Sequence, residues 1–258
     1  MFIIDTHAHY DDEKFDDDRE EILLSMKGSG IGIIVNSGAS MEGVRDTLRL
    51  TEKYDFVYGT AGIHPSETEV LENEGAYQEL KRAVLCPKIL AVGEIGLDYY
   101  WNEPERELQR KHFVKQLNLA REVKKPVVIH SRDAAADTLD IMKALNAQDM
   151  GGIIHCFSYG VEMAREYLNM GFYLGIGGVI TFKNSKKLKE VVEYIPLDRI
   201  VLETDSPYLS PEPNRGKRNS SLNLKYIVEK ISEIKNVTQE HVIETTYSNA
   251  CSVYGLKI

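Results

Sequence analysis

Six histidine and carboxylate residues stand at or just after the ends of short apolar runs, and their types are those of metal ligands. They are His7, His9, Glu94, His130, His155 and Asp205. Imidazole nitrogens and carboxylate oxygens bind divalent transition metals. Two such cations held together can clamp the attacking and the leaving oxygen of a displacement at phosphorus. The residues therefore predict hydrolysis by a metal-activated water.

The pair His7-x-His9 and the carboxylate Glu94 carry most of this expectation. Residues two apart on a strand point to the same side, so the two imidazoles can bind one cation together. Glu94 closes an apolar run that begins at Ile89, where a carboxylate is costly to bury unless it is paired or ligates a metal. Since a carboxylate has two oxygens, Glu94 can bridge two cations.

The other three candidates complete two metal sites that share Glu94. His130 and His155 supply the second cation, and Asp205 completes the first. Paired cations lower the pKa of bound water and so provide hydroxide near neutral pH. Asp205 can take the proton from that water as a general base. We therefore expect Asp205 and Glu94 to be catalytic and two divalent cations to be the cofactors.

Four further residues are candidates for holding the substrate. His64 follows the third apolar run and is expected to orient a ligand or the substrate. Arg215 and Lys217 belong to a basic segment after the eighth run, and Arg132 lies two residues beyond His130. Arginine binds phosphate through two N–H groups and lysine adds a point charge. The alternative for the basic segment is an ordinary solvated loop.

Other residues near the candidate ligands need a separate interpretation. Ser131 and Cys156 follow metal-binding histidines but have no spare histidine as a base, so neither is expected to be a nucleophile. Tyr99 and Trp101 follow Glu94 and either form a wall of the cleft or pack within the fold. The glycine-rich stretch 175–178 does not fit a phosphate-binding loop and is expected to keep the rim open.

Eight short apolar, β-branched runs alternate with amphipathic segments, which predicts parallel βα units. The expected strands are Phe2–Thr6, Gly32–Asn36, Val57–Gly62, Ile89–Glu94, Val127–His130, Gly152–Cys156, Phe172–Gly175 and Ile200–Glu203. Eight units in 258 residues match the (β/α)8 TIM barrel, whose active sites lie at the C-terminal ends of the strands. Five of the seven histidines would then meet on one rim.

Composition limits the class of protein. No linker-like stretch divides the chain, so residues 1–258 are expected to form a single domain. No apolar run is long enough for a transmembrane helix, and the N-terminus lacks the features of a signal peptide. Three well-separated cysteines argue against a disulfide framework and favour the cytoplasm. A net charge of −9 gives no long-range attraction to nucleic acid, so a polyanionic substrate would depend on bound cations and a local basic patch.

Taken together, the motifs resemble the TatD family of metal-dependent deoxyribonucleases, within the amidohydrolase-like barrels. The matching segments are Ile4–His9, Gly62–Pro65, Gly93–Tyr99, Val128–Ala134, Gly152–Phe157, Leu202–Tyr208 and Arg215–Asn219. The resemblance implies one cation held by His7, His9, Glu94 and Asp205, and another held by Glu94, His130 and His155. It also implies hydrolysis of DNA phosphodiesters from a strand end. One departure is Ser220-Ser221, where relatives typically have Glu-Pro, and it puts the family's substrate preference in doubt here.

Three hypotheses follow. The first is a nuclease acting on single-stranded DNA or DNA ends, with no membrane and no obligate protein partner. The second is a metallohydrolase of a small amide, lactone or phosphoester, or of RNA or aminoacyl-tRNA. The third, a non-catalytic metal-binding protein, is disfavoured by the complete ligand set. Four imidazoles favour Zn²⁺ or Mn²⁺ on ligand softness, but nucleases often use Mg²⁺, so the metal stays open.

Overall fold

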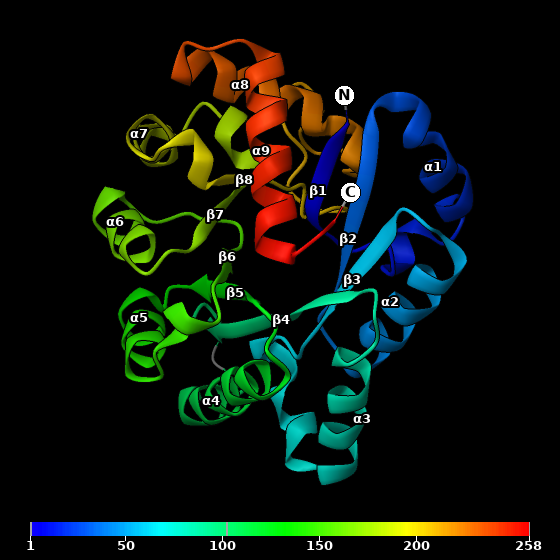
Figure 1. Ribbon diagram of the computed structural model, residues 1–258, viewed down its shortest axis with the longest axis vertical. Coiled ribbons are helices and arrows are strands. Elements are labelled where there is room, and N and C mark those ends of the chain that lie inside the picture. Colours follow the sequence, from blue (N-terminus) through cyan, green and yellow to red (C-terminus); the bar gives the residue numbers. More distant parts are fainter. Residues whose placement is uncertain (1, 102, 258) are drawn as a thin grey trace.

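The protein is described here by a computed structural model that covers residues 2–101 and 103–257. Eight parallel strands form one sheet in their sequence order, and helices follow the strands around its outside (Figure 1). The strands are β1 (Ile3–Ala8), β2 (Ile31–Gly38), β3 (Val57–Ala61), β4 (Ile89–Asp98), β5 (Val127–Arg132), β6 (Gly152–Ile154), β7 (Tyr173–Ile176) and β8 (Ile200–Leu202). The predicted TIM barrel is confirmed.

Helices pack on the outer face of the sheet, as the amphipathic segments predicted. They are α1 (Arg19–Ser25), α2 (Met41–Lys53), α3 (Glu74–Val84), α4 (Arg106–Val123), α5 (Ala135–Ala144), α6 (Val161–Asn169), α7 (Lys186–Tyr194), α8 (Leu224–Lys235) and α9 (Gln239–Tyr254). Short 3₁₀ helices at Glu13–Phe15, Lys27–Ser29, Pro65–Glu72, Ala147–Asp149, Gly178–Thr181, Leu197–Arg199 and Ser221–Asn223 complete the loops. Several helices begin at a side-chain cap, such as the Ser40 hydroxyl that accepts the Gly43 N–H at 3.0 Å.

Contacts between the ends of β1 and β8 draw the sheet towards a closed barrel. Ala8 and Ser206 form a parallel bridge, and the backbone N–H of His9 donates to the carbonyl of Ser206 at 2.6 Å. The N–H of Asp205 donates to the carbonyl of His7 at 3.0 Å. This closure brings the first candidate ligands in the sequence, His7 and His9, next to the last one, Asp205.

Alternating side chains divide the strands between two cores. Residues such as Ile34 and Ile129 face the helices and join the larger cluster. Residues such as Val35 and Val128 face the barrel axis and join a second cluster with Tyr254 of α9. Helix α9 crosses the N-terminal end of the barrel, seen in front in Figure 1, and the Tyr254 hydroxyl donates to the carbonyl of Thr6 at 2.9 Å. The N-terminal end is thus plugged, which leaves the opposite end for a site.

The structure corrects the expected end of β4. We expected this strand to end at Glu94, but it continues to Asp98. A register shift between Val92 and Ile95 interrupts its pairing with β5, after which Ile95 pairs with Ile129 and the ladder resumes. Glu94 therefore lies inside the strand, deeper in the mouth than a strand-end residue would.

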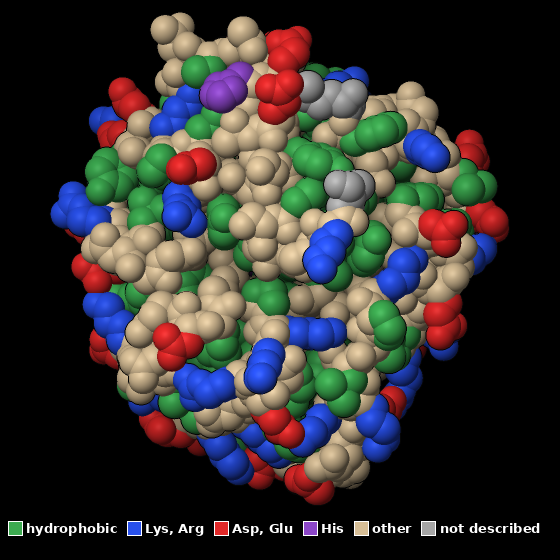
Figure 2. All heavy atoms as spheres, viewed as in Figure 1, with side chains coloured by type: hydrophobic (Ala, Val, Ile, Leu, Met, Phe, Trp, Pro, Cys, Tyr) green, Lys and Arg blue, Asp and Glu red, His purple; other side chains and the backbone are tan. Residues whose placement is uncertain are grey.

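Two findings bear on the predictions made from composition. Among the helices in the described residues, none combines the length and the apolar character that a membrane crossing requires. Cys86, Cys156 and Cys251 are all free thiols. Positive and negative side chains are interspersed over the face that holds α9 (Figure 2).

Candidate metal centre at the barrel mouth

The six predicted ligands converge at the C-terminal end of the barrel, around the carboxylate of Glu94. Glu94 is 4% exposed, and its two oxygens face different histidines. Its Oε2 lies 3.3 Å from Nε2 of His7 and 3.9 Å from Nε2 of His9. Its Oε1 lies 2.7 Å from Nδ1 of His130 and 3.8 Å from Nε2 of His155. The carboxylate is therefore placed as a bridge between two groups of imidazoles.

Asp205 closes the other side of the cluster. Its Oδ1 lies 3.4 Å from Nε2 of His9, 3.8 Å from Nε2 of His7 and 3.7 Å from Nε2 of His155. The rings of His7 and His155 stack with centroids 3.5 Å apart. His155 thus lies between Glu94 and Asp205, and either carboxylate can share a cation with it.

Hydrogen bonds on the far side of the imidazoles fix which nitrogen faces the cluster. Nδ1 of His9 lies 2.9 Å from the carbonyl of Ser37, which can only accept, so the ring donates there and leaves the Nε2 lone pair inward. Nδ1 of His155 lies 3.1 Å from Oε2 of Glu203, so this ring also donates from Nδ1 and turns its Nε2 towards the cluster. Such partners orient metal-binding imidazoles and raise their basicity.

His130 is held in the reverse sense, by Asp98. Its Nε2–H donates to Oδ2 of Asp98 at 3.0 Å, and its Nδ1 faces Glu94. The sequence analysis missed both Asp98 and Glu203 as partners of the ligands. Each stands at the end of an apolar run. Asp98 comes four residues after Glu94, and Glu203 comes two residues before Asp205. A signal was therefore present, since a carboxylate at such a position is costly to bury unpaired.

Glu203 is fully buried, and the glycine-rich stretch 175–178, which begins inside β7, makes room for it. A Cβ at Gly175 would lie 2.2 Å from Oε2 of Glu203, so only glycine fits there. Oε1 of Glu203 accepts the backbone N–H of Cys156 at 2.7 Å. The stretch was expected to keep the rim open. In the structure, Gly175 lets the backbone approach Glu203.

Two buried glutamines on α4 hold the strand ends in place. The Gln109 amide bonds the backbone of Asp98 in both directions, at 2.9 and 3.0 Å. The Gln116 amide does the same for Ile63, at 2.8 and 3.0 Å, and so fixes the loop that carries His64. Both residues interrupt the apolar face of a helix.

His64 lies beside the cluster with a donor directed at it. Its Nδ1 accepts the backbone N–H of Ser66 at 3.2 Å, which puts the proton on Nε2, 3.9 Å from Oε1 of Glu94. Burial lowers the pKa of His64 to about 4, and the neighbouring His130 adds to the effect. At neutral pH His64 is therefore an uncharged imidazole whose N–H can bind an oxygen.

The two central carboxylates are held in their charged forms. Burial alone would raise the pKa of Glu94, but the adjacent His155 and His7 hold that pKa well below its ordinary value. Burial likewise opposes ionisation of Asp205, and the hydrogen bond with His9 together with the charge of His155 lowers its pKa. Two buried anions among imidazoles form an electrostatic site for cations.

The donor set fits divalent metal ions. The Nε2 atoms of His7 and His9 lie only 3.1 Å apart, an arrangement that a shared cation would stabilise. Three donor groups, each with its ligand atoms within 4.8 Å of one another, overlap here: His7, His9 and Glu94; His7, His155 and Asp205; and His64, Glu94 and His130. Mixed imidazole and carboxylate ligands suit Zn²⁺, Mn²⁺ or Fe²⁺.

Ser131 and Cys156, which were not expected to be nucleophiles, form no hydrogen bond with a histidine among the described residues. The Ser131 hydroxyl bonds Thr138 at 3.0 Å and Tyr159 at 2.9 Å, with no histidine involved. Burial raises the pKa of the Cys156 thiol well above its ordinary value, and the charge of Asp205 raises it further. Neither side chain is activated for attack.

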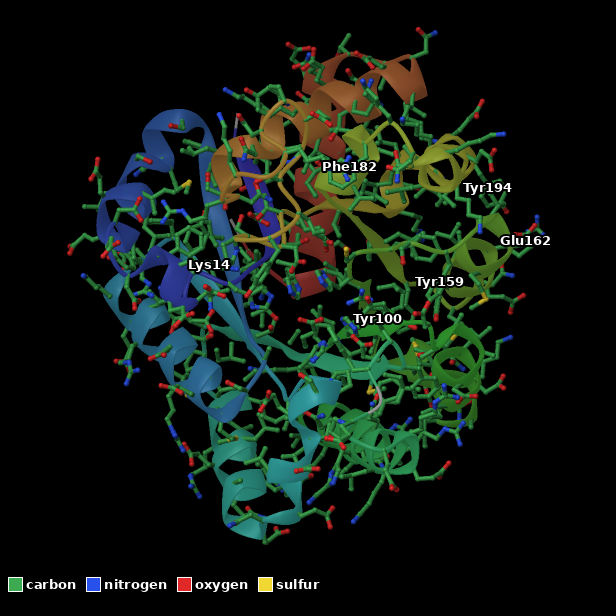
Figure 3. The ribbon with its side chains drawn as sticks, turned by 180° about the vertical axis from the view of Figure 1, so that it is seen from behind. Lys14, Tyr100, Tyr159, Glu162, Phe182 and Tyr194 are labelled. Atoms are coloured by element: carbon green, nitrogen blue, oxygen red, sulfur yellow. The ribbon has the colours of Figure 1, made fainter. Side chains whose placement is uncertain are left out.

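Cationic side chains surround the centre on the rim. Seen from the end opposite to Figure 1, Lys14, Tyr100, Tyr159 and Phe182 lie around the middle of the barrel (Figure 3). The Arg215 guanidinium lies 4.3 Å from the Phe182 ring centroid, and Lys14 lies 4.1 Å from that of Tyr208.

The basic segment after β8 divides into bound and free cations. Arg218 binds both carboxylate oxygens of Asp18, at 2.8 and 2.5 Å, and thereby ties the β8 loop to the loop after β1. Arg215, Lys217 and Arg132 form no ion pair with any residue in the described ranges and are exposed. The predicted substrate-binding residues on the rim are thus free to meet an anion.

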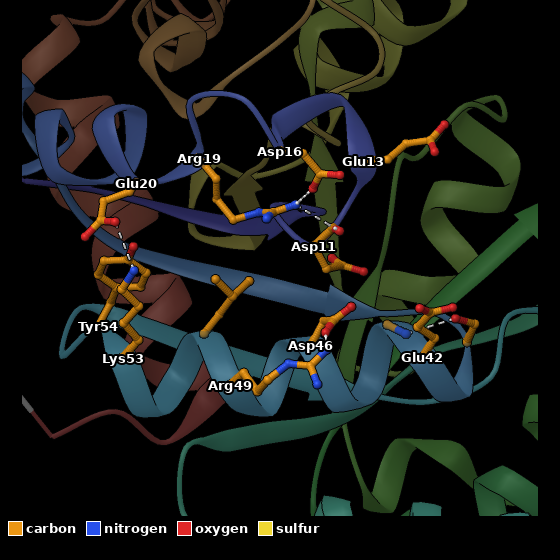
Figure 4. Close-up of a pocket in the computed structure, with 13 residues that line it drawn as sticks. Asp11, Glu13, Asp16, Arg19, Glu20, Glu42, Asp46, Arg49, Lys53 and Tyr54 are labelled. Atoms are coloured by element: carbon orange, nitrogen blue, oxygen red, sulfur yellow. Dashed lines mark hydrogen bonds and ion pairs between the residues drawn. The ribbon is translucent and has the colours of Figure 1, made fainter.

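A second hollow, of about 730 Å³, lies away from the mouth, between the loop after β1 and helix α2 (Figure 4). Its cations are paired within it: Arg19 with Asp16 at 2.6 Å, Lys53 with Glu20 at 3.2 Å, and Arg49 with Asp46. Further carboxylates there, such as Asp11, leave the hollow acidic, which disfavours a polyanion. The chemistry belongs to the mouth.

Comparison with known proteins agrees with the geometry. The family model described as TatD related DNase matches residues 4–255. An uncharacterized metal-dependent hydrolase of Bacillus subtilis, YabD, is 42% identical over 98% of this chain and 99% of its own length. YcfH of Escherichia coli K12, with the same description, is 33% identical over 99% of this chain and 97% of its own.

A solved structure supports the same conclusion. The TatD homologue YJJV from Escherichia coli K12 superposes with a TM-score of 0.91 at 28% identity, covering 99% of this chain and 98% of that one. Sequence, fold and centre point in one direction: the chain belongs to the TatD related DNase family of metal-dependent hydrolases.

Proposed function

We propose that the protein is a divalent-metal-dependent deoxyribonuclease that removes nucleotides from the ends of DNA strands, using two cations. The observation that carries the proposal is the placement of Glu94, whose Oε2 faces His7 and His9 while its Oε1 faces His130 and His155. Membership of a family described as TatD related DNase supplies the substrate class.

The proposed ligands follow from this placement. One cation would be held by His7, His9, Glu94 and Asp205, and the other by Glu94, His130 and His155. When bound, such cations lower the pKa of water and neutralise charge that develops on a phosphodiester. Asp205 is on the open side of the cluster, more exposed than Glu94. Its carboxylate is proposed as the group that takes the proton from the attacking water.

Residues around the cluster are proposed to hold the substrate. The Nε2–H of His64 can donate to a non-bridging phosphate oxygen, because its Nδ1 is occupied by Ser66. Arg132, Arg215 and Lys217 supply the local positive charge that a chain of net charge −9 otherwise lacks. Arg218 is left out of this group because Asp18 already occupies its guanidinium.

The test is degradation of labelled DNA by protein that has been stripped with EDTA and reloaded with Mg²⁺, Mn²⁺ or Zn²⁺. We expect linear single-stranded DNA to be shortened progressively from one end, and a circular single strand of the same sequence to survive. Elemental analysis should find about two metal ions per chain.

Three results would contradict parts of this proposal. Cleavage of the circle would refute digestion from ends, and one tightly bound ion with full activity would refute the two-cation arrangement. No cleavage of DNA with any metal, together with turnover of RNA or of a small phosphoester, lactone or amide, would replace the substrate. The matched control is the same protein in EDTA, which should be inactive on every substrate.

A further inference from the structure

Two aromatic side chains stand exposed at the mouth, directly after β4. Tyr100 is 53% and Trp101 58% exposed, which is unusual for side chains whose burial would be favourable. Their ring centroids lie 4.8 Å apart and the ring planes are at 89°. In this edge-to-face contact, one ring meets the other with its edge. Whichever ring supplies the edge, at least one broad face of the indole is not covered by Tyr100.

A cation completes this pair. The guanidinium of Arg132 lies 3.7 Å from the centroid of the Tyr100 ring. Stacking on the ring occupies one face of the guanidinium, while its N–H groups point outward in the plane and stay available. No carboxylate in the described residues pairs with Arg132. The three side chains therefore offer an open aromatic face beside an unneutralised donor of phosphate contacts.

The aromatic pair is joined to the metal centre by short, direct links. Oδ1 of Asp98 accepts the backbone N–H of Tyr100 at 3.0 Å, while Oδ2 of the same carboxylate accepts from His130. The backbone N–H of Tyr99 donates to the carbonyl of Arg132 at 2.9 Å, two residues along β5 from His130. The exposed rings are thus held at a fixed place next to a proposed ligand.

Tyr99 shows that exposure is not general in this loop. Its hydroxyl donates to Asp137 at 2.7 Å and accepts from Arg110 at 3.0 Å, and Arg106 lies over its ring. Of the aromatic residues considered from the sequence, Tyr99 packs against α4 and α5, whereas Trp101 is exposed. Tyr99 is therefore held by neighbouring side chains, whereas Tyr100 and Trp101 stay exposed.

We propose that Trp101, with Tyr100 and Arg132, forms a stacking subsite for an unpaired nucleobase next to the reacting phosphodiester. The indole face would receive the base, and Arg132, positioned by Tyr100, would bind an adjoining phosphate. Aromatic stacking accepts every base but needs it unpaired, so the subsite would select single-stranded or frayed ends without reading sequence. The proposal rests on the nuclease function proposed above.

The first test compares Trp101→Ala with a matched control on the outer surface. Tyr194 on α7 is 45% exposed, and its hydroxyl accepts a hydrogen bond from Arg165 at 3.2 Å, so Tyr194→Ala removes an exposed aromatic side chain far from the mouth (Figure 3). We expect Trp101→Ala to raise KM for a single-stranded oligonucleotide about 5- to 150-fold, with a much smaller change in kcat. Trp101→Phe should recover most of the loss, and Tyr194→Ala should match the wild type.

The second test removes the base instead of the side chain. With wild-type protein, one abasic position near the cleaved end should raise KM as much as Trp101→Ala raises it for the intact oligonucleotide. The abasic position and Trp101→Ala together should raise KM no further than either change alone. Equal values of KM for Trp101→Ala and Tyr194→Ala, or an abasic defect that adds fully to Trp101→Ala, would refute the subsite.

Two further readouts separate this proposal from its premise. Trp101 is the only tryptophan in the sequence, so stacking of a base should quench the intrinsic indole fluorescence, and an abasic strand should quench it less. Quenching without cleavage would sustain the subsite and refute the nuclease, whereas cleavage without quenching would do the reverse. If Trp101→Ala lowers kcat/KM for methyl p-nitrophenyl phosphate as much as for DNA, its effect is structural and the subsite is refuted.

Discussion

The floor of the barrel mouth and its rim differ in how their polar groups are held. On the floor, Glu94 and His155 are buried, and each faces several other charged or hydrogen-bonded side chains. On the rim, Arg132 and Trp101 are exposed, and the Arg132 guanidinium stacks on a neighbouring ring. A buried group that loses its partner is costly, whereas an exposed one returns to water. Changes on the floor should therefore abolish metal binding, and changes on the rim should alter which substrate binds and how strongly.

The largest effect should come from Glu94→Gln. The substitution keeps the shape but removes the charge that both imidazole groups face, so each cation loses an anionic ligand. We expect kcat/KM on DNA to fall by about 10³-fold or more and the bound metal to drop below one ion per chain. The DNA degradation assay measures the fall in kcat/KM, and elemental analysis measures the loss of metal. Circular dichroism shows whether the variant is still folded. A variant that keeps both metals and activity would mean that the floor is not the catalytic centre.

A smaller loss is expected from Glu203→Gln, which alters a partner of a ligand. The amide can still accept the N–H of Cys156, but its NH2 group would oppose the Nδ1–H of His155. Loss of such a partner typically weakens metal binding about 10- to 100-fold. Isothermal titration with Zn²⁺ or Mn²⁺ measures the change, and Glu162→Gln on α6, at the outer edge in Figure 3, is the control. Unchanged affinity would show that His155 needs no fixed tautomer.

The sequence was informative where the pattern of the chain itself carries the geometry. Alternating apolar runs predicted the barrel, and their ends predicted that His7, Glu94 and His130 would meet. The partners Asp98 and Glu203 were missed, because their role depends on which side chain lies opposite across the sheet. For the same reason the free Arg215 could not be told from the ion-paired Arg218 three residues later. Spacing along the chain is enough to predict which ligands meet. Which carboxylate pairs with which histidine or arginine depends on contacts between segments that are distant in the sequence.

Ser221 lies where the floor and the rim loop meet, and it explains a departure from the family pattern. Its hydroxyl donates to Oδ2 of the buried Asp5 at 2.6 Å, and its backbone N–H donates to the Tyr10 hydroxyl at 2.9 Å. Proline, which the family resemblance implies at this position, can make neither bond. We expect Ser221→Pro to lower the free energy of unfolding by about 1–3 kcal/mol, measured in urea.

Ser220→Glu, the other half of that departure, is the control for this prediction because it leaves both Ser221 bonds in place. An unchanged or higher stability for Ser221→Pro would show that Asp5 does not depend on the serine. The loop that carries Ser221 would then be held independently of the buried Asp5.

The smallest effect separates two arginines of the same loop. Arg215→Ala removes a free rim cation, so we expect KM for single-stranded DNA to rise a few-fold and the slope of log K against log salt to become shallower by about 0.7. Arg218→Ala breaks the exposed pair with Asp18, for which little loss of stability and little change in that slope are expected. Binding isotherms at several salt concentrations decide between the two roles. Equal slopes for both variants would mean that the ion pair with Asp18 does not set Arg218 apart from Arg215 in binding DNA.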